Sequence, residues 1–205
     1  MLGVDLRFGD YLDRLRDELA RVDQDRVGEL ADLIYRAWEN EKSVFFFGNG
    51  GSATASSHLA EDLAKNCLTQ QAVDCRSEEH HRRLKVLSLT DNVGWITALA
   101  NDYSYDQIFV QQLMHYAQPG DLAVAISGSG NSPNVLVAVD WANRHGLTTF
   151  GLTGFDGGRL KQMQKTGLHV ALDDMAMVES IHLAVCHWVV DDLHGRITKS
   201  GRYGP

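Results

Sequence analysis

Two short apolar segments that each run directly into a glycine- and serine-rich turn constrain the fold of this chain most strongly. Residues 44–47 (VFFF) are followed at once by residues 48–52 (GNGGS), and residues 122–126 (LAVAI) are followed by residues 127–132 (SGSGNS). A helical pattern of apolar residues begins after each turn. Short, wholly apolar strands that alternate with helices are typical of a parallel sheet covered on both faces. The sequence therefore predicts an α/β fold.

Strand-like and helix-like stretches alternate over the rest of the chain as well. Apolar residues recur at helical spacing over residues 10–41, and the polar break at Asp23-Gln24-Asp25 predicts two helices. We expect these two to form a hairpin that packs on the sheet or on another subunit. The polar segment at residues 66–83 is expected to be a solvated loop. The other predicted elements are strands at residues 84–89, 148–152 and 169–172 and helices at residues 53–65, 93–100, 107–116, 135–142, 157–164 and 178–197.

Together these elements predict a doubly wound, five-stranded parallel sheet. The 205 residues suit one domain. We expect a single domain over residues 1–205, with N-terminal helices at residues 1–42, an α/β core at residues 43–197 and a tail at residues 198–205. In such a sheet, ligands bind beyond the carboxyl ends of the strands.

The acidic balance of the chain argues against two classes of partner. Lys and Arg total 19 and Asp and Glu total 27, for a net charge of −8, so we expect no nucleic-acid partner and no membrane partner. No apolar run approaches the length of a membrane span, and residues 1–5 lack the features of a signal peptide. The three cysteines, Cys67, Cys75 and Cys186, show no paired spacing and are typical of reduced thiols. These features predict a cytoplasmic protein.

The two glycine-serine turns are candidates for binding a phosphate group. Glycines let the backbone approach a ligand, and free amide groups at a helix N-terminus favour an anion. The P-loop pattern is absent from both turns. The first turn fits the dinucleotide pattern G-x-G-x-x-A, but Asp91 lies too far along the chain to be the acidic residue that such a site needs. Either turn alone is equally well an ordinary tight turn, whereas two at matching strand ends favour a site for a small phosphate monoester.

A second group of residues suits acid–base or metal chemistry. His58 and Asp62 are four residues apart and share one face of a helix. Glu179, His182 and His187 lie on or just before the last helix, where Glu179 and His187 are separated by about 12 Å along a straight helix. Histidine and carboxylate ligands suit zinc. The alternative is that His58 caps a helix or lies in the core and that Glu179 and His182 form a surface pair. His80, His81 and His115 have weaker claims, and Cys186 is expected to be packed against the sheet.

These residues, taken together, resemble the sugar isomerase (SIS) family, and most closely its phosphoheptose isomerase branch. The resemblance covers nearly the whole chain. It is carried by FGNGGS at residues 47–52, the His58 and Asp62 pair, NDY at residues 101–103, PGD at residues 119–121, ISGSGNS at residues 126–132, LTG at residues 152–154 and DGG at residues 156–158.

The family implies a flavodoxin-like fold, a homotetramer with active sites at subunit junctions, and a sugar phosphate as the substrate. The expected activity is an aldose–ketose isomerisation of sedoheptulose 7-phosphate through an enediolate, assisted by zinc. Asp62 would move the carbon proton and His187 would exchange a proton with the sugar oxygens. The zinc ligands would be His58, Asp62, Glu179 and His187. The substrate would contact Asn49, Gly50, Gly51, Ser52, Thr90, Asp91, Ser127, Gly128, Ser129, Ser132 and Glu179.

Several positions depart from the family pattern. Asp62 stands where the family has Glu, Glu179 where it has Gln, and Ser180 where it usually has Glu. The segment at residues 66–83 is longer than usual for the family. The alternative to an isomerase is therefore a non-catalytic SIS protein that binds a protein partner or senses a sugar phosphate.

Overall fold

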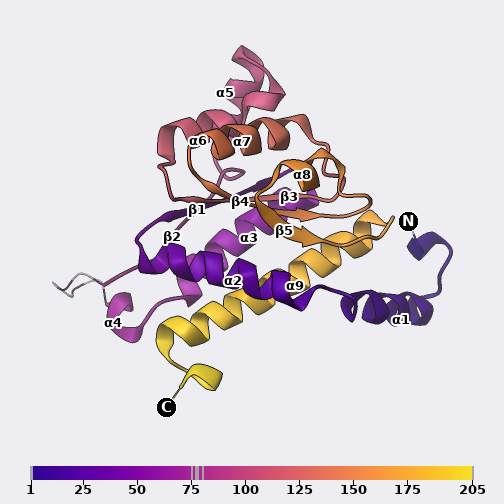
Figure 1. The fold of residues 1–205 in the computed structure, drawn as a ribbon, viewed down its shortest axis with the longest axis horizontal. Helices are drawn as coiled ribbons and strands as arrows, with labels where there is room; N and C mark the ends of the chain where they lie inside the picture. The colour runs from indigo at the N-terminus through magenta and orange to yellow at the C-terminus, as the bar shows by residue number, and fades with distance from the viewer. Residues whose placement is uncertain (1, 75, 77–78, 80, 205) are drawn as a thin grey trace.

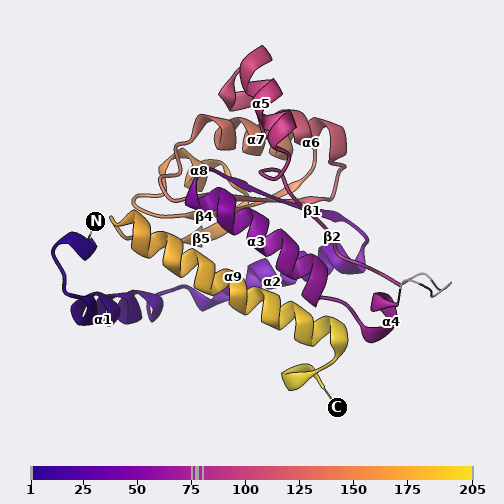
Figure 2. The same cartoon turned by 180° about the vertical axis from the view of Figure 1, so that it is seen from behind.

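A parallel sheet of five strands lies between two layers of helices in the computed structural model, which describes residues 2–74, 76, 79 and 81–204 (Figures 1 and 2). The strand order is β2-β1-β3-β4-β5 and all four neighbouring pairs are parallel. The predicted doubly wound sheet is confirmed. The strands are β1 (Ser43–Gly48), β2 (Lys85–Ser88), β3 (Leu122–Ser127), β4 (Thr148–Thr153) and β5 (Thr166–His169).

Helices cover both faces of the sheet. Helices α2, α3 and α9 lie on one face; α6, α7 and α8 lie on the other, with α5 standing outside that layer (Figures 1 and 2). The α-helices are α1 (Phe8–Leu19), α2 (Gln24–Glu39), α3 (Gly51–Asn66), α4 (Gln70–Val73), α5 (Val93–Asp102), α6 (Val110–Tyr116), α7 (Pro133–Arg144), α8 (Gly158–Met163) and α9 (Met175–Thr198); short 3₁₀ turns are η1 (Leu2–Val4), η2 (Tyr105–Gln107) and η3 (Gly201–Tyr203).

The apolar run in β1 serves both layers because successive side chains of a strand point to opposite faces. Val44 and Phe46 pack with α2, α3 and α9, whereas Phe45 and Phe47 pack with α6 and α7. All four side chains are buried. This two-sided burial explains why the strand is continuously apolar rather than alternating.

Strand β5 lies three residues earlier than the predicted strand at residues 169–172. It pairs with β4 from Phe150 opposite Thr166 to Thr153 opposite His169. A side chain at Gly167 would collide with Gln164 and with the backbone of Gly151. The glycine is therefore required by a close approach of the two strands, and its lack of apolar character hid the strand in the sequence.

The two N-terminal helices do not form the predicted hairpin. Helix α1 extends beyond the end of α2 and runs in nearly the same direction (Figure 1). Asp23 begins α2 in an extended conformation, and its side chain accepts hydrogen bonds from the amides of Asp25 and Arg26. Tyr11 and Leu15 of α1 pack on a small cluster at the start of α9, whereas Phe8, Leu12 and Leu19 of the same helix remain exposed.

The segment at residues 66–83 is not only a solvated loop. It contains α4, which begins at Thr69, whose side chain accepts a hydrogen bond from the amide of Ala72. Ala72 is buried, and its carbonyl accepts a hydrogen bond from Arg83. Cys75 and His80, both considered in the sequence analysis, lie outside the described residues. No helix in the described parts of the chain is both long enough and apolar enough to cross a membrane.

Candidate active site between α3 and α9

The two glycine-serine turns lie next to each other because β1 and β3 are neighbours at the point where the strand order reverses. Asn49 in the first turn and Asn134 at the start of α7 exchange two amide hydrogen bonds, of 2.9 and 2.8 Å. The hydroxyl of Tyr105 also donates to Asn49, over 3.2 Å. The side chain of Asn49 therefore fixes the first turn to the element that follows the second.

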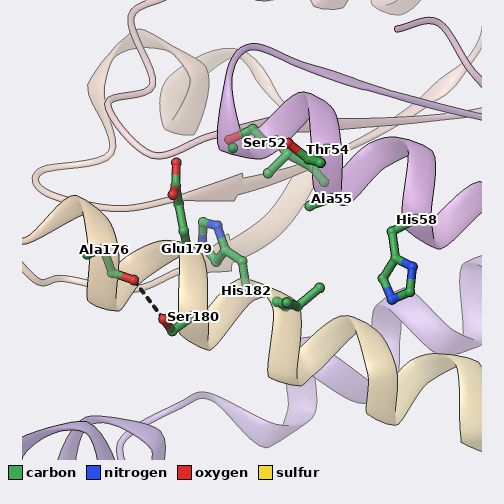
Figure 3. A pocket seen from close by; sticks show the side chains of 11 residues that line it. Ser52, Thr54, Ala55, His58, Ala176, Glu179, Ser180 and His182 are labelled. Atoms are coloured by element: carbon green, nitrogen blue, oxygen red, sulfur yellow. Dashed lines mark hydrogen bonds between the residues drawn. The ribbon is translucent and has the colours of Figure 1, made fainter. Parts of the chain in front are cut away.

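A cavity of about 420 Å³ opens beside the first turn, between the first half of α3 and the first half of α9 (Figure 3). Glu179, Ser180 and His182 of α9 and Ser52, Thr54, Ala55 and His58 of α3 face this space (Figure 3). We call this cavity the α3–α9 pocket. Its lining residues are Gly51, Ser52, Thr54, Ala55, His58, Ile126, Ala176, Glu179, Ser180, His182 and Leu183.

Glu179 reaches from α9 to the first turn of α3. A side chain at Gly51 would place its Cβ 2.6 Å from both carboxylate oxygens of Glu179. Gly50, which precedes the helix, has φ +56°, a conformation that glycine adopts readily. Gly50 is therefore needed for the backbone conformation of the turn, and Gly51 leaves space for the Glu179 carboxylate.

His58, Asp62 and His187 form a compact cluster between the two helices. The Nε2 atoms of His58 and His187 are 2.8 Å apart, and His58 Nε2 lies 3.4 Å from Asp62 Oδ2. Asn66 donates to the other oxygen of Asp62, over 3.1 Å. His58 also lines the α3–α9 pocket, so the cluster and the pocket share this residue.

The donor atoms of this cluster fit a zinc ion. One atom from each of the three residues lies within 4.8 Å of the others. Tetrahedral zinc with ligand bonds of about 2.0–2.2 Å places neighbouring ligand atoms about 3.3 Å apart, and three protein ligands leave the fourth position open. Glu179, the fourth expected ligand, is not part of this cluster in the described residues. It lies in the α3–α9 pocket instead.

Thr90 and Asp91 follow β2 and lie against α3. Thr90 is within hydrogen-bond distance of Ser57 (2.9 Å) and Ser88 (2.6 Å) and donates to the carbonyl of Ala53 over 3.2 Å. The hydroxyl of Ser57 donates to Asp91. Thr90 and Asp91 therefore contact α3 at Ala53 and Ser57. They are not among the residues that line the α3–α9 pocket.

The second turn combines buried and accessible serines. Ser127 is buried at the end of β3, whereas Ser129 and Ser132 are partly exposed. Ser132 begins α7, and its side chain makes no capping hydrogen bond. A side chain at Gly128 would collide with Met175 at the start of α9, so the second turn lies directly against the helix that carries Glu179 and His187.

His182 does not form the surface pair with Glu179 that the sequence left open as an alternative. It is 2% exposed, and its Nε2 lies 3.2 Å from the carbonyl oxygen of Thr153. His182 lies on the buried side of α9, together with Ile181 and Val185. The packing of Cys186 against the sheet is confirmed, and burial raises the pKa of its thiol to about 12.

Comparison with known proteins supports the same fold and identifies the family. The SIS domain family model matches residues 7–154. A phosphoheptose isomerase of Nitratidesulfovibrio vulgaris is 35% identical over 174 residues, which cover 85% of this chain and 79% of that protein. A probable phosphoheptose isomerase of Thermoplasma acidophilum is 34% identical over 179 residues, which cover 87% of this chain and 93% of that protein.

Solved structures agree. A phosphoheptose isomerase from Francisella tularensis has a TM-score of 0.79 at 26% identity, covering 94% of this chain and 98% of that one. A phosphoheptose isomerase from Neisseria gonorrhoeae has a TM-score of 0.77 at 28% identity, covering 88% and 91%. The expected resemblance is confirmed. The chain belongs to the SIS domain family, and its relatives within that family are phosphoheptose isomerases.

Proposed function

We propose that the chain is a sugar-phosphate aldose–ketose isomerase that acts on sedoheptulose 7-phosphate. The observation that carries this proposal is the cluster of His58, Asp62 and His187 at the edge of the α3–α9 pocket, close to two glycine-serine turns. The relatives named as phosphoheptose isomerases support the same reaction class. The phosphate is assigned to the second turn, with Ser127, Gly128, Ser129 and Ser132 as its contacts, and the sugar chain to Asn49, Gly50, Gly51, Ser52, Thr90, Asp91 and Glu179.

The reaction moves a proton between adjacent carbons of the open-chain sugar. Asp62 is assigned this transfer, because Asn66 holds one of its oxygens and leaves the other facing His58. His187 is assigned the proton exchange with the sugar oxygens, since an imidazole can donate from one nitrogen and accept at the other. Binding of the phosphate in the second turn positions the reacting carbons over the cluster.

Zinc is proposed as the cofactor, held by His58, Asp62 and His187. When bound, it supplies Lewis-acid polarisation of the sugar carbonyl and hydroxyl. The support for zinc is the donor set, two imidazole nitrogens and one carboxylate oxygen within 4.8 Å of one another. Glu179 is assigned to the substrate pocket, because its carboxylate lies at Gly51.

A homotetramer in the cytoplasm is proposed as the working form. Large apolar side chains are exposed on α1 and around α5, among them Phe8 (77%), Val93 (67%) and Tyr103 (71%). Exposed apolar side chains of this size favour burial against another subunit. Light scattering on the purified protein tests this assembly: a monomer at micromolar concentration would contradict it.

Steady-state kinetics on sedoheptulose 7-phosphate test the function. Asp62→Asn and His187→Ala are each expected to lower kcat by about 10²–10⁴-fold, the usual contribution of a general acid or base. His145→Ala is the matched control, because His145 is exposed at the end of α7 and does not line the pocket. Full turnover in both variants would refute the assigned roles. The departures at Asp62 and Glu179 favour a sugar-phosphate sensor as the second candidate, and wild-type binding without turnover would select it.

A further inference from the structure

The orientation of the Asn134 side chain is fixed by the backbone amide of Val135. That amide donates to Asn134 Oδ1 over 3.0 Å, and a backbone N–H can only donate. The atom that faces Val135 is therefore the oxygen of the carboxamide, and the other is the nitrogen, Nδ2. Asn134 is 1% exposed, so a ligand does not reach this side chain, and Asn134 acts only through the residues that it contacts.

Asn134 in turn fixes the carboxamide of Asn49. Its Nδ2 donates to Asn49 Oδ1 over 2.8 Å, and its Oδ1 accepts from Asn49 Nδ2 over 2.9 Å. In a reversed Asn49 amide, nitrogen would face nitrogen and oxygen would face oxygen, and both hydrogen bonds would be lost. The Tyr105 hydroxyl, 3.2 Å from Asn49 Oδ1, must then be the donor, because the oxygen that it faces carries no proton.

These hydrogen bonds leave the Asn49 side chain with one free polar group. A carboxamide oxygen has two lone pairs, and those of Asn49 accept from Asn134 and Tyr105. The nitrogen carries two protons, and one of them is donated to Asn134. In the parts of the chain that the structure describes, no other residue bonds to this side chain. Asn49 is partly exposed, so it offers a ligand one N–H donor and no acceptor.

We propose that Asn134 and Tyr105 are positioning residues that hold the Asn49 side chain as a hydrogen-bond donor in the first turn. Asn49 then selects an acceptor oxygen of the ligand and disfavours a group that can only donate. Tyr105 belongs to η2 and Asn134 to α7, so two elements outside the first turn decide what this turn can bind. That the ligand is a sugar phosphate rests on the proposed function, whereas the orientation of Asn49 does not.

A double-mutant cycle on the turnover of sedoheptulose 7-phosphate tests whether Tyr105 acts through Asn49. Tyr105→Phe removes only the hydroxyl of a side chain that is 58% exposed. KM should rise about fivefold, the net contribution of one hydrogen bond. The value of kcat should stay within about twofold, since Asn49 is not part of the His58, Asp62 and His187 cluster. In the Asn49→Ala background, Tyr105→Phe should change KM by less than about twofold.

Tyr116→Phe is the matched control for the lost hydroxyl. Tyr116 is 48% exposed, its ring packs on Trp95, and its hydroxyl takes no part in the Asn49 network, so KM should not change in either background. An equal rise in KM for Tyr105→Phe with and without Asn49 would indicate an ordinary structural effect and overturn the proposal, as would no rise in either background. Asn134→Ala should likewise lose its effect in the Asn49→Ala background, and the Tyr105 cycle decides if that variant does not fold.

Nitrogen-15 relaxation of the Asn49 side-chain amide gives a readout that needs no turnover. The signal is identified by its absence from Asn49→Ala. Its order parameter should fall in Tyr105→Phe and in Asn134→Ala but not in Tyr116→Phe, and unchanged values in the first two variants would overturn the positioning roles. A protein that shows these changes but neither binds nor converts sedoheptulose 7-phosphate would refute the proposed function alone.

Discussion

His58 of α3 and His187 of α9 place their Nε2 atoms 2.8 Å apart, with their rings nearly perpendicular at 86°. At this distance the two nitrogens are within hydrogen-bond range, in which one nitrogen donates and the other accepts. Asp62 lies next to the same nitrogen of His58. The pair joins two helices that are more than a hundred residues apart in sequence, and it is the place where the pocket wall and the proposed metal ligands meet.

Removal of either histidine is expected to weaken zinc binding. His58→Ala and His187→Ala each delete one of three clustered donors, and we expect the zinc affinity to fall by at least about 100-fold, more than the loss caused by outer-shell changes. Competition with a chromophoric chelator measures the affinity. The control variant His145→Ala should bind zinc as the wild type does. Equal zinc affinity in all four proteins would show that the cluster does not hold the ion.

Gly51→Ala is expected to impair the site without destabilising the fold. The added methyl group meets only the tip of the Glu179 side chain, which can move away, and alanine is favoured over glycine within a helix. We expect the free energy of unfolding to change by less than about 1 kcal/mol while KM for the sugar phosphate rises, because the Glu179 carboxylate is displaced.

Gly130→Ala is the contrasting variant. Gly130 has φ +65°, and a side chain there would collide with the backbone of Gly157. We expect a loss of about 3 kcal/mol in the free energy of unfolding. Urea denaturation measures the free energy of unfolding of Gly51→Ala and Gly130→Ala. Equal stability of the two variants would contradict the different roles assigned to these glycines.

Asp192 is expected to anchor the C-terminal turn to α9. Its side chain is fully buried, accepts a hydrogen bond from Tyr203 over 2.6 Å and pairs with Arg196 over 2.7 Å and with Arg202. Asp192→Ala should lower the free energy of unfolding by about 2–3 kcal/mol, less than for a fully buried pair because both arginines are partly exposed. Asp140→Ala, which breaks an exposed pair with Arg144, should cost less than about 1 kcal/mol. Equal losses would contradict the anchoring role.

Stability is expected to fall in mild acid because of His182. Its folded-state pKa of about 4 lies below the ordinary value of 6.5, so the unfolded chain takes up this proton first as the pH drops. The contribution of His182 to the free energy of unfolding is complete above pH 6.5 and is lost as the pH falls toward 4. It amounts to about 3 kcal/mol. His169, whose pKa burial also lowers, acts in the same direction. Urea unfolding between pH 7 and pH 4.5 should show a shallower slope for His182→Gln; an unchanged slope would disprove the assignment.

Much of the fold was predictable because apolar patterning reports burial directly. β1 and β3 are apolar at every position that faces a helix layer, and both turns at their ends were placed correctly. The predicted hairpin failed for a different reason. Apolar periodicity predicts which side of a helix is buried, but it does not predict which element packs against that side. Helices α1 and α2 pack on different parts of α9 and the sheet.

The candidate site was predictable where sequence spacing fixes geometry. The separation of four residues between His58 and Asp62 placed both on one face of α3, and they lie 3.4 Å apart. The resemblance made Glu179 the fourth zinc ligand, but a separation of eight residues from His187 corresponds to about 12 Å along a helix, and Glu179 is outside the cluster in the described residues. The burial of His182 could not be read from the sequence, because burial of a histidine depends on what packs over it, here the end of β4 at Thr153.

Conversion of sedoheptulose 7-phosphate in D₂O, followed by proton NMR on the zinc-loaded protein, tests most directly whether this site isomerises a sugar phosphate. Proton removal by Asp62 and exchange with solvent should yield an aldose heptose 7-phosphate that carries deuterium at C2, and Asp62→Asn should yield almost none. A wild-type sample in which the ketose binds, keeps both C1 protons and forms no aldose would contradict an isomerase at this site.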